Sequence, residues 1–254
     1  MNHIRTGTLN GVATIEIARP EKKNALTMAM YDAMADAIRA ALADRGVRAL
    51  LVTGQPGVFT SGNDLEDFMQ RPPSGPDSPV FRFMEALLDC DKPVVAAVTG
   101  AAIGIGTTML MHCDLVYVSD EARLALPFVG LGLVPEFASS VLLPHLIGHA
   151  RAAEKLMLGD PFGPQEAVDC GIANAVLPAG EVLPHARRMA ERFNALPPEA
   201  VRETKRLMRN GRKAAIAQAR EAENDVFGSR LRSPEAREAF TAFFEKRRPD
   251  FSKF

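Results

Sequence analysis

The sequence has few cysteines, and those it has form no recognisable pattern. The three cysteines, Cys90, Cys113 and Cys170, show no C-x-x-C spacing and no arrangement with the five histidines. Clustered cysteines and histidines are what a structural metal site requires, so we expect no bound metal. We interpret the cysteines as small core residues of a protein from a reducing compartment.

The chain also lacks an excess of charge and a long apolar run. It holds 30 basic residues against 31 acidic ones, so no long-range field draws it to nucleic acid or to a membrane surface. Any charged ligand must therefore be met by local groups. No apolar run approaches the length that spans a bilayer, and the first residues contain no signal-peptide core. These absences predict a cytoplasmic protein with neither a nucleic-acid nor a membrane partner.

What the sequence does contain is an alternation of β-branched and amphipathic segments up to about residue 180. Residues 11–18, 47–54, 92–100 and 113–120 are typical of strands, and 27–44 has apolar residues at helical spacing. With 254 residues, 47% of them hydrophobic, the chain is long enough for one substantial core. The pattern predicts an α/β fold with buried strands.

From about residue 185 the chain becomes helical. Its helical segments, 185–196, 198–211, 212–230 and 233–248, carry Pro, Gly or Ser at their ends, so that Gly211 is expected to end one of them. Their apolar stripes need a surface to pack on, either their own core or a neighbouring subunit. Between two earlier helical stretches, residues 70–80 hold four prolines and are expected to form a loop. This loop is placed to shape a binding pocket.

The stretch Val58–Phe68, VFTSGNDLEDF, raises the first functional question. Small residues and a glycine lead into a helix that begins near Asp64. In one interpretation Asp64 caps this helix, with Asp67 completing a capping box. In the other, backbone N–H groups before the helix point outward to hold an anion.

Residues 98–120 contain a second glycine-rich turn. Gly104 and Gly106 follow a strand and precede a helix, but a dinucleotide-binding motif would need glycine where Met109 stands. A nucleotide site is therefore disfavoured. Two interpretations remain open: tight packing at the glycines, or further N–H donors at Ile105.

Glu136 is the third candidate. It follows Pro135 and precedes an apolar helical run. As a first-turn acid it would be exposed and would stabilise the helix by under about 1 kcal/mol. As a lone carboxylate in an apolar pocket, with its pKa raised by desolvation, it would be a useful general base. The sequence leaves both interpretations open.

Five segments together resemble the enoyl-CoA hydratase/isomerase family, which has the crotonase fold, over nearly the whole chain. That resemblance implies a spiral of ββα units in residues 1–195, holding the CoA and active sites, and a helical trimerisation region in 196–254. It implies acyl-CoA thioester substrates, no separate cofactor, and homotrimers or dimers of trimers. The segments are RPEKKNAL (19–26), FTSGNDL (59–65), GAAIGIG (100–106), CDLVYVSDEARLALPFVGLGLVPE (113–136) and AFFEKRRPDF (242–251).

The resemblance also implies roles for particular residues. The N–H groups of Asn63 and Ile105 correspond to an oxyanion hole for a thioester enolate. The two glutamates that hydratases use fall at Thr108 and Phe128, which disfavours hydration. The placement of Glu136 is instead similar to that in peroxisomal-type Δ3,Δ2-enoyl-CoA isomerases, in which one glutamate moves a proton from C2 to C4. We therefore expect conversion of 3-enoyl-CoA to trans-2-enoyl-CoA in fatty acid degradation, in a pocket lined by Phe128, Leu126 and Phe137.

Substrate and CoA contacts are expected at a larger set of positions. Lys246 could equally be a solvated cation at a helix end. Two alternatives stay open: another crotonase-fold activity (weak hydratase, dienoyl-CoA isomerase or thioesterase) using Glu136, Glu66 or Asp67, and an acyl-CoA-binding protein without catalysis. The expected contacts are Lys23, Asn24, Ala25, Ser61, Gly62, Asp64, Leu65, Gly104, Thr108, Phe128, Phe243 and Lys246.

Overall fold

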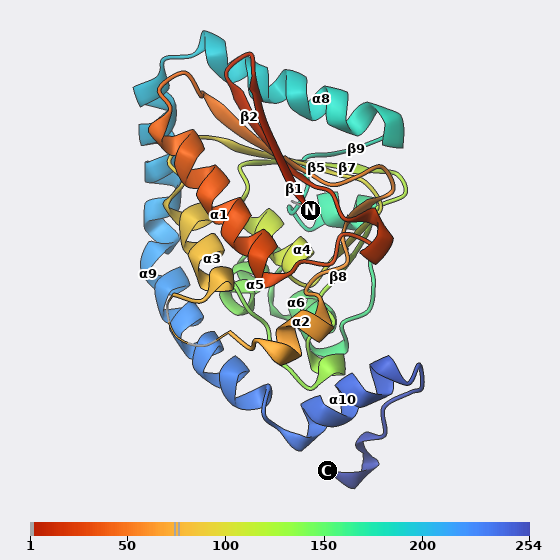
Figure 1. Cartoon of the computed structure of the whole chain (residues 1–254). Coiled ribbons are helices and arrows are strands. Elements are labelled where there is room, and N and C mark those ends of the chain that lie inside the picture. Colours follow the sequence, from red (N-terminus) through yellow and green to blue (C-terminus); the bar gives the residue numbers. More distant parts are fainter. Residues whose placement is uncertain (1–2, 74, 76) are drawn as a thin grey trace.

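Two β-sheets lie between helices in the structure, a computed structural model that describes residues 3–73, 75 and 77–254 (Figure 1). The large sheet has the order β1-β2-β3-β5-β7-β9, and the small sheet has the order β4-β6-β8. The large sheet comprises β1 (Ile4–Leu9), β2 (Val12–Ile17), β3 (Ala49–Thr53), β5 (Val94–Val98), β7 (Leu115–Ser119) and β9 (Ala175–Leu177). The four strands predicted from the sequence are confirmed as β2, β3, β5 and β7.

Pairs of strands repeat along the chain, and each pair contributes one strand to each sheet. The small sheet comprises β4 (Val58–Thr60), β6 (Ala101–Ile103) and β8 (Arg123–Ala125), which directly follow β3, β5 and β7. All pairings are parallel except that of β1 with β2. The expected α/β spiral of ββα units is confirmed.

Helices cover both faces of the large sheet. On one face lie α1 (Met28–Ala43) and α3 (Pro79–Asp89), and on the other lies α8 (Ala179–Glu191) (Figure 1). Successive residues of β3 are buried against opposite faces, Leu50 toward α1 and α3 and Leu51 toward α8. Because both faces are buried, residues 49–52 of this strand are all apolar rather than alternating, as the sequence indicated.

The C-terminal part differs in detail from the prediction. Residues 198–230 form one helix, α9 (Pro198–Arg230), although Gly211 was expected to end a shorter helix. A glycine inside a helix costs only about 1 kcal/mol. Contacts between α9 and the rest of the protein offset this cost, for example the ion pair between Lys205 Nζ and Asp114 Oδ2 at 2.6 Å. Next follows α10 (Pro234–Phe244), capped by Ser233. Assignment of 196–254 to trimerisation stays a prediction.

The three cysteines are free thiols: Cys90 and Cys170 are buried and Cys113 is partly buried. No helix in the described part of the chain combines the length and apolar character needed to cross a bilayer. The expected loop 70–80 separates α2 from α3, and its residues 74 and 76 lie outside the described residues. The remaining helices and helical turns are short. They are α2 (Leu65–Gln70), α4 (Ile105–Thr108), α5 (Ser139–Ile147), α6 (His149–Ala153), α7 (Pro164–Asp169), 3-10 turns at Pro20–Lys22, Met109–His112, Val129–Leu131, Arg192–Ala195 and Phe251–Lys253, and a π-helical turn at Glu154–Leu158.

Candidate active site

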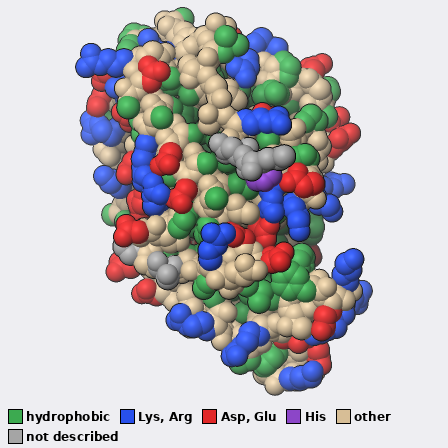
Figure 2. All heavy atoms as spheres, in the orientation of Figure 1, with side chains coloured by type: hydrophobic (Ala, Val, Ile, Leu, Met, Phe, Trp, Pro, Cys, Tyr) green, Lys and Arg blue, Asp and Glu red, His purple; other side chains and the backbone are tan. Residues whose placement is uncertain are grey.

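The small sheet brings the candidate residues together. Its three strands are parallel, so their carboxyl ends meet at one edge, which is where α/β sheets usually bind ligands. The chain continues there into Asn63 after β4, Ile105 after β6 and Phe128 after β8. All three residues line one cavity of about 720 Å³. Hydrophobic side chains gather on the surface where the segment with α10 meets the rest of the protein (Figure 2).

In the described part of the chain, the backbone N–H groups of residues 61–64, which follow β4, are hydrogen-bonded with one exception. The N–H groups of Ser61, Gly62 and Asp64 donate to acceptors within the protein, at 3.1, 3.1 and 2.8 Å. The N–H of Asn63 has no acceptor among the described residues. A single unpaired donor at a cavity wall can therefore bind an incoming oxygen atom.

The second turn repeats this arrangement. Gly104 N–H donates to Ala125 O at 2.9 Å, and Thr107 N–H donates to Gly104 O at 2.8 Å. Ile105 is the first residue of α4, and within the described chain its N–H has no partner. Ile105 is only 2% exposed, so its side chain is packed inward.

Glycine is needed where the two turns approach each other. Gly62 has a φ of 91°, and a Cβ there would lie 2.9 Å from Ile103 O. A Cβ on Gly106 would lie 2.6 Å from the Thr60 side chain. The glycines therefore allow close contact between the turns, so the packing interpretation and the donor interpretation are compatible.

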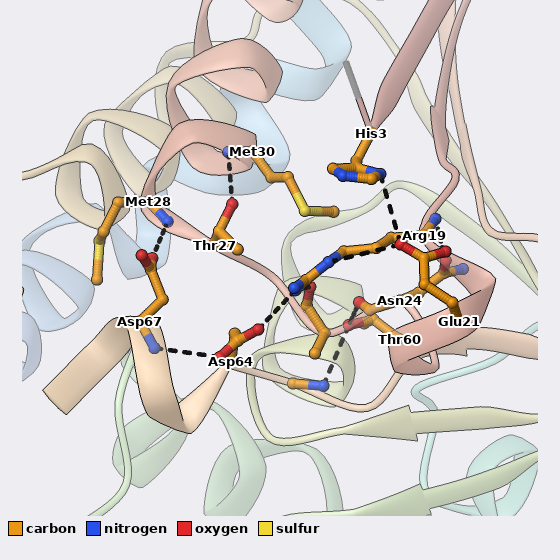
Figure 3. A network of polar contacts seen from close by, with 12 residues as sticks. His3, Arg19, Glu21, Asn24, Thr27, Met28, Met30, Thr60, Asp64 and Asp67 are labelled. Atoms are coloured by element: carbon orange, nitrogen blue, oxygen red, sulfur yellow. Dashed lines mark hydrogen bonds and ion pairs between the residues drawn. The ribbon is translucent and has the colours of Figure 1, made fainter. Parts of the chain in front are cut away.

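An arginine network fixes the first turn to the loop before α1. Arg19 Nη1 donates to Ala25 O at 2.9 Å and pairs with Asp64 Oδ2 at 2.6 Å (Figure 3). Burial would raise the pKa of Asp64, but the Arg19 hydrogen bond and charge outweigh it and keep that pKa below its usual value. Asn24 Oδ1 accepts from the Arg19 N–H at 2.7 Å. This network holds residues 23–25 beside residues 61–64.

Asp64 does cap α2, as predicted, by accepting from the Asp67 N–H at 3.1 Å. The expected reciprocal half of the capping box is wrong. The Asp67 carboxylate accepts instead from Met28 N–H at 2.7 Å and pairs with Arg71, while the Asp64 N–H donates to Leu26 O. The Asp67 carboxylate is therefore held by Met28 and Arg71, and within the described chain Asp67 does not line the cavity; its bond to Met28 is drawn in Figure 3.

The expected substrate contacts divide into two groups. Asn24 and Thr108 are fully buried and, within the described chain, neither lines the cavity; nor does Lys246, which is exposed beyond the end of α10. The exposed carboxylate of Glu66 lines the cavity as well. The expected substrate contacts that do line the cavity are Lys23, Ala25, Ser61, Gly62, Asp64, Leu65, Gly104, Phe128 and Phe243.

Glu136 is a buried carboxylate rather than an exposed first-turn acid. It lies three residues before the start of α5 and is 7% exposed. The Thr108 hydroxyl donates to Glu136 Oε1 at 2.5 Å. Burial raises the pKa of Glu136 to about 8, against the opposing hydrogen bond from Thr108 and with a further upward contribution from the charge of Glu223. Such a pKa suits a group that exchanges a proton near neutral pH.

Glu136 does not itself line the cavity in the described chain. Its partner Thr108 ends α4, one helical turn or about 5 Å along the axis from Ile105. Glu136 thus contacts the last residue of α4, whose first residue, Ile105, lines the cavity. Two expected lining residues are placed differently: Leu126 and Phe137 are 0% and 1% exposed and belong to the core.

Two supporting residues were missed by the sequence analysis. The Tyr31 hydroxyl donates to Asn63 Oδ1 at 2.5 Å, and Tyr31 is fully buried on α1. Burial, followed by the charge of Glu136, raises the pKa of Tyr31 well above its usual value. Glu223 on α9 contacts the residues that follow Glu136. Neither has a local sequence signal, because each partner lies far along the chain.

Comparison with known proteins agrees with this geometry. The enoyl-CoA hydratase/isomerase family profile matches residues 7–253, so the chain belongs to this family. It is 34% identical to a crotonyl-CoA hydratase from Syntrophomonas wolfei, over 94% of each chain. It is 32% identical to human enoyl-CoA delta isomerase 2, over 94% of this chain and 62% of the relative.

Solved structures give the same result. The Pseudomonas aeruginosa OdaA structure superposes with a TM-score of 0.94 at 53% identity, covering 96% of this chain and 99% of the other. The expected family is therefore confirmed, together with its implied acyl-CoA chemistry. The sequence identity to relatives named as hydratases is about the same as that to relatives named as isomerases, so it does not single out the isomerases.

Proposed function

We propose that this protein isomerises 3-enoyl-CoA to trans-2-enoyl-CoA with Glu136 as its single acid–base group. The observation that carries the proposal is the buried Glu136 carboxyl, with its raised pKa, beside Thr108 at a position where hydratases of the family have a glutamate. Moving a double bond requires one base that takes a proton and returns it, and it requires no bound water.

The steps balance without a cofactor. The Glu136 carboxylate removes a proton from C2, and the electrons of that C–H bond delocalise into a dienolate. The thioester oxygen then carries the negative charge, which the free N–H groups of Asn63 and Ile105 stabilise. Two such donors supply roughly 3 to 8 kcal/mol of transition-state stabilisation. The protonated Glu136 returns the proton to C4 and regenerates the carboxylate.

The proposal requires the Glu136 carboxyl group to meet the acyl chain at the cavity wall. Phe128 and Leu133 line the cavity and are 5% and 6% exposed, and the proposal requires apolar side chains of this kind to shift so that the carboxyl group reaches the substrate. An apolar wall would also exclude water and protect the dienolate. CoA would lie along Lys23, Ala25 and Ser61, and self-association to a trimer or a dimer of trimers is part of the same proposal.

Product analysis tests this function. The purified protein would receive trans-3-hexenoyl-CoA or crotonyl-CoA, and the absorbance of the conjugated enone would be followed. Isomerisation creates this absorbance from the first substrate, whereas hydration removes it from the second. We expect the first result, its loss in Glu136→Gln, and its retention in Glu66→Gln, which changes an exposed carboxylate that lines the cavity.

Hydration is the second candidate, since several relatives are named as hydratases. It would require a pair of acids. Of the three carboxylates considered for such an activity, Asp67 is held by Met28 and Arg71, which leaves Glu66 and Glu136. Loss of crotonyl-CoA absorbance that depends on both would favour it over isomerisation. Binding of CoA esters without turnover of either substrate would favour a protein that only binds them.

A further inference from the structure

Glu223 on α9 is a buried carboxylate outside the proposed chemistry. It is 7% exposed, and burying a charged group is costly unless hydrogen bonds compensate. Its compensation comes from the residues just after Glu136. Oε2 accepts from the Ala138 N–H at 2.6 Å, and Oε1 accepts from the Ser140 N–H at 2.9 Å and from the Ser140 hydroxyl.

The backbone that Glu223 contacts is strained. Phe137 and Ala138 have φ values of 57° and 59°, in the left-handed region that residues with a side chain rarely adopt. Side chains make this conformation unfavourable, so contacts from the surroundings must maintain the turn. The turn begins at Glu136 itself, whose carbonyl oxygen accepts from the Ser139 N–H, so it fixes the backbone that carries the carboxyl group bonded to Thr108.

Two further contacts hold the same turn from other sides. Ser139 donates to Glu136 O through its N–H at 3.1 Å and its hydroxyl at 2.7 Å. His112 stacks on the Phe137 ring at 3.9 Å, and its Nε2–H donates to Phe137 O at 2.8 Å. Burial lowers the pKa of His112 to about 3, so the imidazole is neutral and its proton lies on Nε2. Among these contacts, those of Glu223 come from α9, the long helix in Figure 1.

We propose that Glu223 is a positioning residue for the reaction: its hydrogen bonds to Ala138 and Ser140 fix the left-handed turn and thereby aim the Glu136 carboxyl group. This inference rests on the proposed role of Glu136. It makes α9 part of the active-site support, so that a helix far along the chain from Glu136 controls the geometry of the base.

The test replaces Glu223 with glutamine. A carboxylate accepts at both oxygens, whereas the amide has one acceptor and one donor group, so Glu223→Gln loses the bonds to either Ala138 or Ser140. The matched control is Glu221→Gln, which removes the same charge from an exposed position two residues away on α9. Turnover of trans-3-hexenoyl-CoA and amide hydrogen exchange of residues 136–140 would be measured for each.

We expect Glu223→Gln to lower kcat on the order of 10-fold or more with little change in KM, because misplacing a base by a fraction of an ångström affects the chemical step more than binding. Exchange at 136–140 should accelerate, and the control should match the wild type in both. Ser140→Ala, which removes only the hydroxyl bond, should show a smaller effect of the same kind, and it serves if Glu223→Gln does not fold.

Two results would overturn the inference: unchanged exchange at 136–140, or faster exchange with an unchanged kcat. The second would leave Glu223 with a structural role alone. Failure of the proposed function is distinguishable, since it appears as a wild type that does not isomerise the substrate. In that case accelerated exchange in Glu223→Gln would still establish that Glu223 holds the turn, and unchanged exchange would refute it.

Discussion

Replacing Glu136 with glutamine should stabilise the fold while it removes activity. The pKa of Glu136 rises from 4.5 to about 8 on folding, chiefly through burial. Between these two values the native state holds a proton that the unfolded chain releases, so the free energy of unfolding falls as pH rises, by about 1.4 kcal/mol per pH unit. Glutamine keeps an acceptor for the Thr108 hydroxyl and does not titrate.

The magnitude follows from linkage. The wild type should lose about 2.5 kcal/mol of stability relative to Glu136→Gln between pH 5 and pH 7, and the difference should level off above pH 8. Urea unfolding of both proteins at several pH values and one protein concentration would measure it. Parallel pH dependence of the two proteins from pH 5 to 8 would refute the elevated pKa and, with it, the argument that burial prepares the base.

Three further changes test the parts around Glu136. Thr108→Val removes the hydrogen bond that opposes the effect of burial, so the pH profile of kcat/KM should shift to higher pH; an unshifted profile would contradict this. Tyr31→Phe removes the hydroxyl that orients Asn63 and should lower kcat more than it changes KM, with a stability loss of about 1 kcal/mol in thermal unfolding. Gly62→Ala should destabilise the protein by about 1 to 3 kcal/mol and reduce turnover, because its backbone is left-handed; normal stability and activity would contradict the close-packing argument.

Much of the fold could be predicted because its signals are local. The apolar segments that became β3 and β5 are buried on both faces, so their composition alone marks them as strands. The resemblance of FTSGNDL and GAAIGIG to the family pointed to Asn63 and Ile105, and both residues line one cavity with N–H groups that have no acceptor in the described part of the chain. Short motifs with a backbone role are well suited to this kind of inference.

The rest depends on contacts between distant residues. The strands β4, β6 and β8 have three residues each, too few for a period-2 pattern to appear, although they position the site. The burial of Glu136 follows from packing with Thr108 and the turn that Glu223 holds, which no neighbouring residue reveals. Gly211 gave a misleading local signal because tertiary contacts along α9 outweighed it.

The most direct test of the central claim is the fate of the proton that leaves C2. The substrate would be trans-3-hexenoyl-CoA carrying deuterium at C2, and the deuterium at C4 of the product would be measured by mass spectrometry for the wild type and Glu136→Gln. A single glutamate that takes and returns the same proton predicts deuterium at C4 in the wild type and loss of turnover in the variant. Product whose C4 hydrogen comes entirely from water, formed at an undiminished rate by Glu136→Gln, would contradict the account.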